Sequence, residues 1–441
     1  MSNRTSPPAA HWYSRATLPT LVIFILLYHF AAIDRFAMGA LINPVKAALG
    51  LTDEQVGRTA TIFTLANIFA APLFGFLGDR YRRKWLLLGG LLLWSVATFG
   101  SGLAYGFGAL LVWRALVGMG EASFESLAPG WLGDMFGARH RSWIFSLSVG
   151  AGTSAFMVTY VAGGFMADRY GWHAAFFLAG APGLLLTLGL LLLREPARGH
   201  ADGYHQPPRL PTLGETFLLL RNPNYILIAL GGTAYLFSLG GLSFWGSAYF
   251  HRQYGIANHE ATTFFGIGYL LPGTPATLLG GLAGGWLQRR YRAGFSIWMA
   301  AVSLLAGITI LPALLASDVH TAEVWIWIEI IFATAGLGLS NPLLFEEVPV
   351  ALRNSAVAGV VAVSGVGGVM LQTQGIGWVS DRVGLHGALF LVPAVYLIST
   401  ALWLVLALRQ HVRKEESPLQ VESILAESDE IPELPVEIPV S

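Results

Sequence analysis

Gly75-Phe-Leu-Gly-Asp-Arg-Tyr-Arg-Arg-Lys84 is the most informative segment of this chain. It packs five charged residues into a short turn between two apolar segments, each long enough to cross a bilayer as a helix. Basic loops are ordinary between membrane helices, because loops on the cytoplasmic side collect Lys and Arg. That explanation accounts for the bases but not for Asp79 or for the glycine spacing. The stretch therefore predicts a polar hairpin with a specific role between two membrane helices.

The composition is that of a membrane protein. Of the 441 residues, 54% are hydrophobic and 12% are charged, whereas soluble domains carry about 25% charged residues. Apolar stretches of about 20 residues recur, and each can cross ~30 Å of hydrocarbon as a helix with its backbone hydrogen bonds satisfied internally. We expect an all-α membrane protein. Twelve membrane helices are predicted, at approximately 18–42, 57–78, 85–104, 109–132, 142–166, 174–193, 224–250, 260–287, 295–316, 323–345, 355–379 and 387–408.

The distribution of positive charge predicts the orientation. Most of the 26 Lys and Arg lie on one side of the membrane if both termini lie there, and the positive-inside rule makes that side cytoplasmic. The first residues lack the pattern of a cleavable signal peptide, so we expect the first apolar stretch to be a retained helix. The sequence thus predicts an integral, multi-pass protein with both termini in the cytoplasm.

A long polar break divides the chain into two sets of six predicted helices. Residues 194–222 hold four arginines and several prolines, and we expect them to form a cytoplasmic linker. The predicted organisation is a cytoplasmic N-terminus at 1–17, an N-terminal bundle at 18–193 and a C-terminal bundle at 223–408. The tail at 409–441 is acidic and proline-containing beyond its first residues, and is expected to be disordered and cytoplasmic.

The two halves repeat each other in sequence. Gly171-Trp-His-Ala-Ala-Phe-Phe-Leu178 returns 213 residues later as Gly384-Leu-His-Gly-Ala-Leu-Phe-Leu391. At the same offset, Asp168-Arg169 matches Asp381-Arg382. Polar matches at one fixed offset favour a true repeat over chance similarity of apolar segments. The predicted architecture is two parallel six-helix repeats, with a substrate site at their interface near the middle of the membrane.

Charged residues inside the predicted helices mark candidate functional positions. A charge at the bilayer centre costs about 2.5–3.5 kcal/mol and usually faces a partner or a cavity. Arg114, Glu121 and Glu125 stand at i, i+7 and i+11, and therefore on one face of the fourth helix. We predict proton coupling by Asp34, Glu121 and Glu125, because neighbouring carboxylates repel each other when both are ionised. Arg35 and Arg114 are the predicted counter-ions or headgroup contacts; a purely structural ion pair is the alternative.

Glu329 is a further acid inside a predicted span, on the tenth helix. It lies beside Trp325 and Trp327. An aromatic belt at the membrane interface explains such a position, so no functional role is predicted for it.

The hairpin pattern G-x-L-x-D-R-x-x-R-K resembles the signature loop between the second and third helices of the major facilitator superfamily of transporters. The resemblance implies a conformational switch formed by Gly75, Asp79, Arg80 and Arg83. In one state it would pin the second and third helices against the eleventh helix. Arg82 departs from the pattern, because glycine is common at that place.

The fourth helix carries a second resemblance. Arg114-Ala-Leu-Val-Gly-Met-Gly120 is similar to the superfamily's helix 4 motif R-x-x-x-G-x-G, whose arginine is associated with proton transfer. The hairpin also recurs in the second half as Gly285-Trp-Leu-Gln-Arg-Arg-Tyr-Arg292, with Arg289 where the acid stood.

Motifs spread over residues 30 to 200 carry a closer resemblance. They are Asp34-Arg-Phe36, Gly78-Asp-Arg-Tyr81, Arg114-Ala-Leu-Val-Gly-Met-Gly-Glu-Ala-Ser-Phe124, Ala128-Pro129 and Arg194-Glu-Pro-Ala-Arg-Gly199. Over these residues the chain resembles the Spinster family of the superfamily. That resemblance implies transport of lysosphingolipids or lysophospholipids, sphingosine-1-phosphate being the best-known substrate class. Glu125 departs from the family, which usually has a small polar residue there, and this either disfavours an anionic phosphate headgroup or changes the proton stoichiometry.

The expected function is secondary active transport of an amphipathic, lipid-like substrate by alternating access, coupled to protons. A proton-coupled multidrug or organic-ion transporter is the alternative. The aromatic residues Phe124, Tyr160, Tyr235 and Trp245 are candidates for the wall of the substrate cavity. A short chain without cysteine suggests a bacterial inner-membrane protein, and a monomer is expected.

Other functional classes receive less support from the sequence. His173 and His386 could serve a lipid enzyme, but their positions repeat in the two halves, which favours helix capping or loop packing. The sequence holds no nucleophile motif or phosphate-binding loop, so we expect no enzyme activity, no cofactor, no metal and no nucleic-acid partner. A receptor or a scramblase stays open.

Overall fold

The first half of the chain forms six membrane helices. The structure is a computed structural model that describes residues 17–136, 138–197, 219–348 and 353–412. The predicted disordered tail lies outside these residues except for its first four, which continue the last helix. The helices of this half are α1 (Thr17–Ala40), the short α2 (Ile42–Leu49), α3 (Asp53–Arg80), α4 (Arg83–Ser101), α5 (Phe107–Met135), α6 (Ala138–Tyr170) and α7 (Trp172–Leu192).

The second half also forms six membrane-length segments, three of which are interrupted. A 3-10 turn, η1 (Leu219–Arg221), leads into this half. Counted along the whole chain, the eighth and eleventh membrane segments contain π-helical turns, and the tenth contains a 3-10 turn. The segments are α9 (Pro223–Tyr254); α10 (Asn258–Gly268) with η2 (Tyr269–Gly273) and α11 (Thr274–Arg290); α12 (Gly294–Leu315); α13 (Val319–Thr334) with η3 (Leu337–Leu339) and α14 (Ser340–Glu347); α15 (Arg353–Val363) with η5 (Ser364–Gly375) and α16 (Ile376–Leu389); and α17 (Leu391–Val412).

The described residues confirm the predicted all-α membrane fold. Ten helical stretches are long and apolar enough to cross a membrane. The remaining two predicted spans are helical as well, as α6 and as the run from α10 to α11. The observed helices extend the predicted ranges mostly at their ends, where polar caps continue the helix beyond the apolar core. At the start of α3, for example, Thr52 and Gln55 form a reciprocal capping box.

The predicted parallel repeat is visible in backbone geometry. Gly171 has φ +83° and Gly384 has φ +81°, a conformation that residues with a Cβ rarely adopt. Each glycine is followed two residues later by a histidine that contacts a backbone carbonyl in its own half. His173 Nδ1 lies 2.6 Å from the oxygen of Gly102, and His386 Nε2 lies 2.9 Å from that of Leu314. These contacts agree with the loop-packing role expected for the duplicated histidines.

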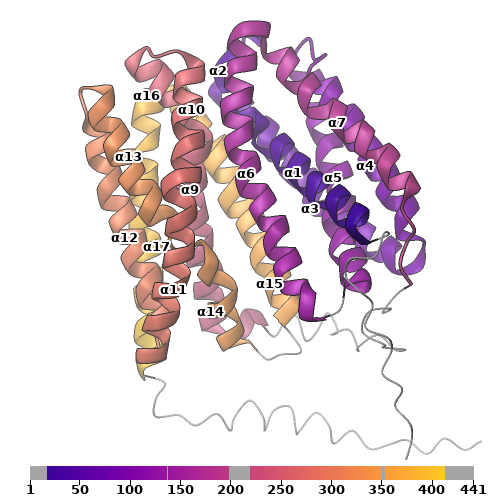
Figure 1. The fold of residues 1–441 in the computed structure, drawn as a ribbon. Helices are drawn as coiled ribbons and strands as arrows, with labels where there is room; N and C mark the ends of the chain where they lie inside the picture. Colours follow the sequence, from indigo (N-terminus) through magenta and orange to yellow (C-terminus); the bar gives the residue numbers. More distant parts are fainter. Residues whose placement is uncertain (1–16, 137, 198–218, 349–352, 413–441) are drawn as a thin grey trace, which may run out of the picture.

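The helices begin and end at two opposite sides of the bundle. We call the side where α1 begins and α17 ends the terminal side, and the opposite side, where α3 begins at Asp53, the far side. Figure 1 shows the first half, from indigo to magenta, beside the second half, from salmon to yellow, with α2, α10 and α16 toward the far side. Helices alternate in direction, so residues far apart in sequence meet at each side.

Contacts between the halves concentrate on the far side and in the middle of the bundle. They join α3 to η5 and α16, α6 to α10 and η2, and α1 to α9. Tyr160 on α6 donates a hydrogen bond to the main-chain oxygen of Ser243 on α9, and Thr61 on α3 meets Thr373 on η5 at 3.5 Å. On the terminal side, the principal contacts of α11, α14 and α15 are within their own half. In this state the halves are therefore joined on the far side.

Candidate functional site

A cluster of five charged side chains lies inside the first half. Asp34 and Arg35 project from α1, and Arg114, Glu121 and Glu125 project from α5. The structure thus brings together all five residues that the sequence predicted for proton coupling and charge pairing. They lie well inside their helices and not in loops, as expected for a site within the membrane.

Arg35 bridges the two glutamates. Its Nη2 donates to Oε1 of Glu121 and to Oε1 of Glu125. One cation thus lies between two carboxylates that stand one helical turn apart. The second oxygen of Glu125 accepts from the Asn67 side chain on α3 at 3.0 Å, whereas Oε2 of Glu121 is buried with no hydrogen-bond partner.

Asp34 is held by a third helix that the sequence analysis did not include in the site. Its Oδ2 accepts from the indole N–H of Trp94 and from the Thr98 hydroxyl at 3.0 Å. Both donors belong to α4, at i and i+4, and therefore on one face of that helix. The signal available in the sequence was Thr98, a hydroxyl residue one helical turn from Trp94 on the third predicted helix. The other oxygen, Oδ1, is buried with no hydrogen-bond partner.

Arg114 is fully enclosed beside Asp34. Its Nη1 donates to the main-chain oxygen of Asp34 at 3.2 Å, and its guanidinium lies 4.8 Å from the centre of the Phe63 ring. A Cβ at Gly118, one turn further along α5, would meet the Phe63 carbonyl oxygen at 2.2 Å. Only glycine fits there, so the glycine of the helix 4 motif lets α5 approach α3 closely beside the charged cluster.

The cluster is closed at one end and open at the other. The side chain of Glu121 is fully buried, whereas those of Arg35 and Glu125 are 44% and 37% exposed. Three carboxyl groups face two guanidinium groups, so full ionisation leaves one excess negative charge. A buried uncompensated charge is costly, and one added proton neutralises the set. The arrangement can therefore take up one proton.

The second half contains an isolated buried acid. Glu329 on α13 is fully buried, and its Oε1 accepts from the Tyr396 hydroxyl at 3.0 Å. Its Oε2 has no hydrogen-bond partner. The interfacial explanation expected for Glu329 was therefore wrong, because neighbouring tryptophans in sequence do not reveal which helix face a glutamate occupies.

The four aromatic residues predicted to line a substrate cavity are all buried in this state. Phe124 packs in the first half, with its ring 4.7 Å from that of Tyr28. Tyr160 joins the two halves, as described above. Tyr235 donates to the Ala333 carbonyl, and Trp245 donates to the Gln372 carbonyl at 3.0 Å. Their place in a substrate cavity stays a prediction.

The predicted switch loop forms a tight connection on the terminal side. Only two residues separate the end of α3 at Arg80 from the start of α4 at Arg83. Arg83 pairs with Asp134 at the end of α5, and its amide donates to Glu195 at 2.9 Å. The Arg80 guanidinium lies 3.4 Å from the centre of the Phe76 ring. None of these contacts involves the second half.

Gly75 and Asp79 are the other two members of the predicted switch loop. A Cβ at Gly75 would find no atom within 4 Å, so packing in this state does not require glycine there. The side chain of Asp79 lies outside the part that the structure describes. Pinning of the loop against the eleventh segment stays a prediction for a state in which the terminal side is closed. Among the described residues, no group of three or more His, Asp or Glu could hold a metal ion.

Sequence relatives agree with this fold. The family description Major Facilitator Superfamily matches residues 24–371. Human protein spinster homolog 1 is 35% identical over 54% of the chain and 46% of its own length. The mouse sphingosine-1-phosphate transporter SPNS2 is 32% identical over 50% of the chain and 41% of its own length. In these alignments the chain spans about half the length of the relatives that it matches.

A solved structure has the same fold. A bacterial homologue of the human lysosomal transporter Spinster, in an inward-facing and unoccupied conformation, superposes with a TM-score of 0.79 at 21% identity. The match covers 90% of this chain and 98% of that one. The chain therefore belongs to the major facilitator superfamily, and within it the chain is similar to Spinster proteins.

Proposed function

We propose that this protein is a proton-coupled secondary transporter that moves an amphipathic, lipid-like substrate by alternating access. The observation that carries the proposal is the charged cluster on α1 and α5, in which three carboxyl groups share two guanidinium groups. Glu121 is buried while its partner Arg35 reaches an exposed surface. A group that can change charge beside an accessible cation links proton binding to substrate binding.

The expected substrate is a single-chain lysophospholipid or a sphingoid lipid. The exposed end of the cluster offers one guanidinium and one carboxylate, Arg35 and Glu125. Such a pair complements a zwitterionic or cationic headgroup better than a phosphate monoester, because an ionised Glu125 repels a second anion. The sphingosine-1-phosphate named for the mouse relative is thus a candidate, but a zwitterionic lysophospholipid fits this cluster better.

We also infer the orientation and the working unit. The terminal side carries the basic hairpin at Arg80–Lys84, so it faces the cytoplasm by the positive-inside rule. Both termini then lie in the cytoplasm, at a bacterial inner membrane, with a linker at 194–222 between two bundles at 18–193 and 223–408. In that orientation the present state, joined on the far side, is open toward the cytoplasm. One chain contains both halves, so a monomer suffices.

Transport by purified protein in proteoliposomes tests the proposal. A pH gradient should drive accumulation of a fluorescent lysophosphatidylcholine, and a protonophore should abolish it. Accumulation of an organic cation in place of every lysolipid would favour the multidrug alternative. Flux that only equilibrates the lysolipid, at any pH gradient, would show a scramblase and refute coupling.

A further inference from the structure

A short motif occurs twice on the far side, once in each half. Asp168-Arg-Tyr-Gly-Trp-His173 ends α6 and begins α7, and Asp381-Arg-Val-Gly-Leu-His386 stands at the same place in the second half. The glycine of each motif has positive φ. The histidine of each contacts a carbonyl oxygen of its own half. The glycine and the histidine therefore fix each motif to its own half.

The aspartate of each motif reaches across to the other half. Oδ1 and Oδ2 of Asp381 accept from the amides of Asp53 and Glu54, at 2.8 and 2.9 Å. These amides belong to the first turn of α3, in the first half. Oδ2 of Asp168 accepts from the amide of His259 at 2.9 Å and lies 2.8 Å from Nδ1 of the same residue. His259 is in the first turn of α10, in the second half.

The two contacts are thus equivalent under the internal repeat. In each, a carboxylate from one half caps the N-terminus of a helix in the other half. The first amides of a helix have no partner within it, and the helix dipole makes that end favourable for a negative charge. Separation of the halves on the far side breaks both caps and leaves four donors to water.

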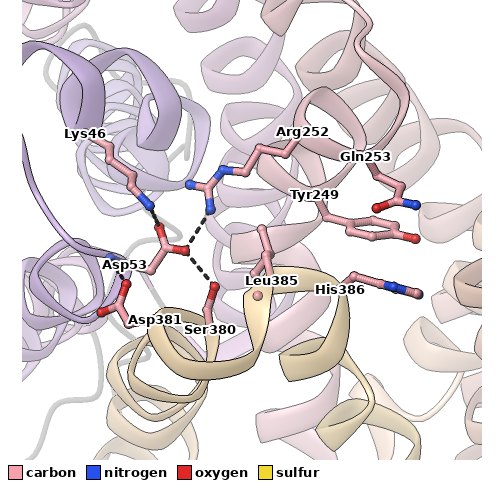
Figure 2. Close-up of a pocket in the computed structure, with 10 residues that line it drawn as sticks. Lys46, Asp53, Tyr249, Arg252, Gln253, Ser380, Asp381, Leu385 and His386 are labelled. Atoms are coloured by element: carbon pink, nitrogen blue, oxygen red, sulfur yellow. Dashed lines mark hydrogen bonds and ion pairs between the residues drawn. The ribbon is translucent and has the colours of Figure 1, made fainter.

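A second carboxylate, that of Asp53, reinforces the contact that Asp381 makes with the first half. Asp53 is almost fully buried, and it accepts from Lys46 at 2.6 Å, from Arg252 at 2.7 Å and from Ser380 at 2.6 Å. Lys46 belongs to the first half, and the other two donors belong to the second. Figure 2 shows these residues converging between the halves, with Asp381 beside them. They line a cavity of about 490 Å³ on the far side.

We propose that Asp168 and Asp381 are paired positioning residues that hold the far side closed, and that both caps must break before the transporter opens there. The inference rests on the proposed alternating-access function. It adds to that function the residues that set the balance between the two states. The contacts exist only while the halves touch, so they stabilise one state and have no counterpart in the other.

Cysteine accessibility measures the balance without any substrate. The chain has no cysteine, so a single Ser247→Cys substitution provides a specific reporter. Ser247 is buried on α9, and its hydroxyl donates to the Gly39 carbonyl of α1 at 3.3 Å. A water-soluble maleimide should label it slowly in the closed state and faster when the far side opens.

In this reporter background, Asp381→Asn and Asp168→Asn should each raise the labelling rate about two- to fivefold, the usual range for a charge at a helix N-terminus. The matched control is Asp318→Asn. Asp318 caps α13 on the same side through Thr321, but within its own half, so its substitution should leave the labelling rate unchanged. An equal rise with the control, or a rise with only one of the two motif aspartates, would overturn the paired role.

Disulfide formation gives a second, independent measurement. Cysteines in place of Thr61 and Thr373, whose hydroxyls are 3.5 Å apart across the halves, should cross-link rapidly under mild oxidation. Asp381→Asn should lower the population of the closed state and so slow this cross-linking, the opposite direction to its effect on labelling. If Asp381→Asn does not fold, Asp381→Glu keeps the charge but misplaces both oxygens and should act in the same direction. Both assays read conformation alone, so failure of lysolipid transport would leave their outcome, and this proposal, intact.

Discussion

Replacement of Glu121 by glutamine should separate transport from its proton coupling. The amide keeps the shape of the side chain and can still accept a hydrogen bond from Arg35. It removes one of three negative charges from a cluster with two positive ones, so the cluster becomes neutral without a bound proton. We expect the variant to fold, because the two remaining carboxylates balance the charge of the two guanidinium groups.

The size of the expected effect on accumulation follows from the single excess negative charge of the cluster. One proton moved per substrate supplies about 1.4 kcal/mol for each pH unit across the membrane, which sustains a roughly tenfold ratio of substrate concentrations. Glu121→Gln should reduce that ratio to about one. Exchange of labelled for unlabelled lysolipid, which needs no gradient, should continue.

The assay is accumulation in proteoliposomes at a pH difference of about one unit, with gradient-free exchange measured in parallel. The matched control is Glu54→Gln, which removes a carboxylate that pairs with Arg58 on the same helix, outside the cluster. The control should retain gradient-driven accumulation. If Glu121→Gln keeps its pH dependence, the glutamate is not the coupling site and the charge argument is refuted.

Three further variants test packing and pairing, each by thermal unfolding of the purified protein. Arg35→Ala should destabilise the protein by about 1–3 kcal/mol, because the buried Glu121 loses its cation while water screens part of the charge of the half-exposed Arg35 and Glu125; an unchanged unfolding temperature would contradict this. Tyr396→Phe should cost about 1–3 kcal/mol, since it removes the hydrogen bond to the buried Glu329, and an unchanged unfolding temperature would contradict this. Gly118→Ala should cost about 1–3 kcal/mol by forcing α5 away from α3, whereas Gly75→Ala, which meets no atom within 4 Å, should leave stability unchanged.

The membrane fold could be read from the sequence because the bilayer constrains it strongly. A backbone in hydrocarbon must satisfy its own hydrogen bonds, so twenty apolar residues in a row have few alternatives to a helix. The repeat was visible for a related reason. Gly171 and Gly384 occupy positions where only glycine adopts the backbone conformation easily, so the fold favours glycine in the sequence at both places.

The candidate site was predicted only in part. The five charged residues were evident, since charges are rare inside membrane helices. Their pairing was not, because helix periodicity specifies a face but not the neighbour across it. Trp94 and Thr98 were missed for this reason, as polar groups that also occur in ordinary helix contacts. The burial of Glu329 was missed as well.

Local sequence is enough to predict that the chain crosses the membrane as helices in two repeats, and that charges on α1 and α5 lie within them. Hydrophobicity and chain length are local properties, and they suffice for that conclusion. The folded molecule was needed to show that Arg35 pairs with two glutamates and that Asp168 and Asp381 bind helices of the opposite half. Those contacts join residues as far apart as 328 positions. They depend on how the two halves pack, which no local pattern encodes.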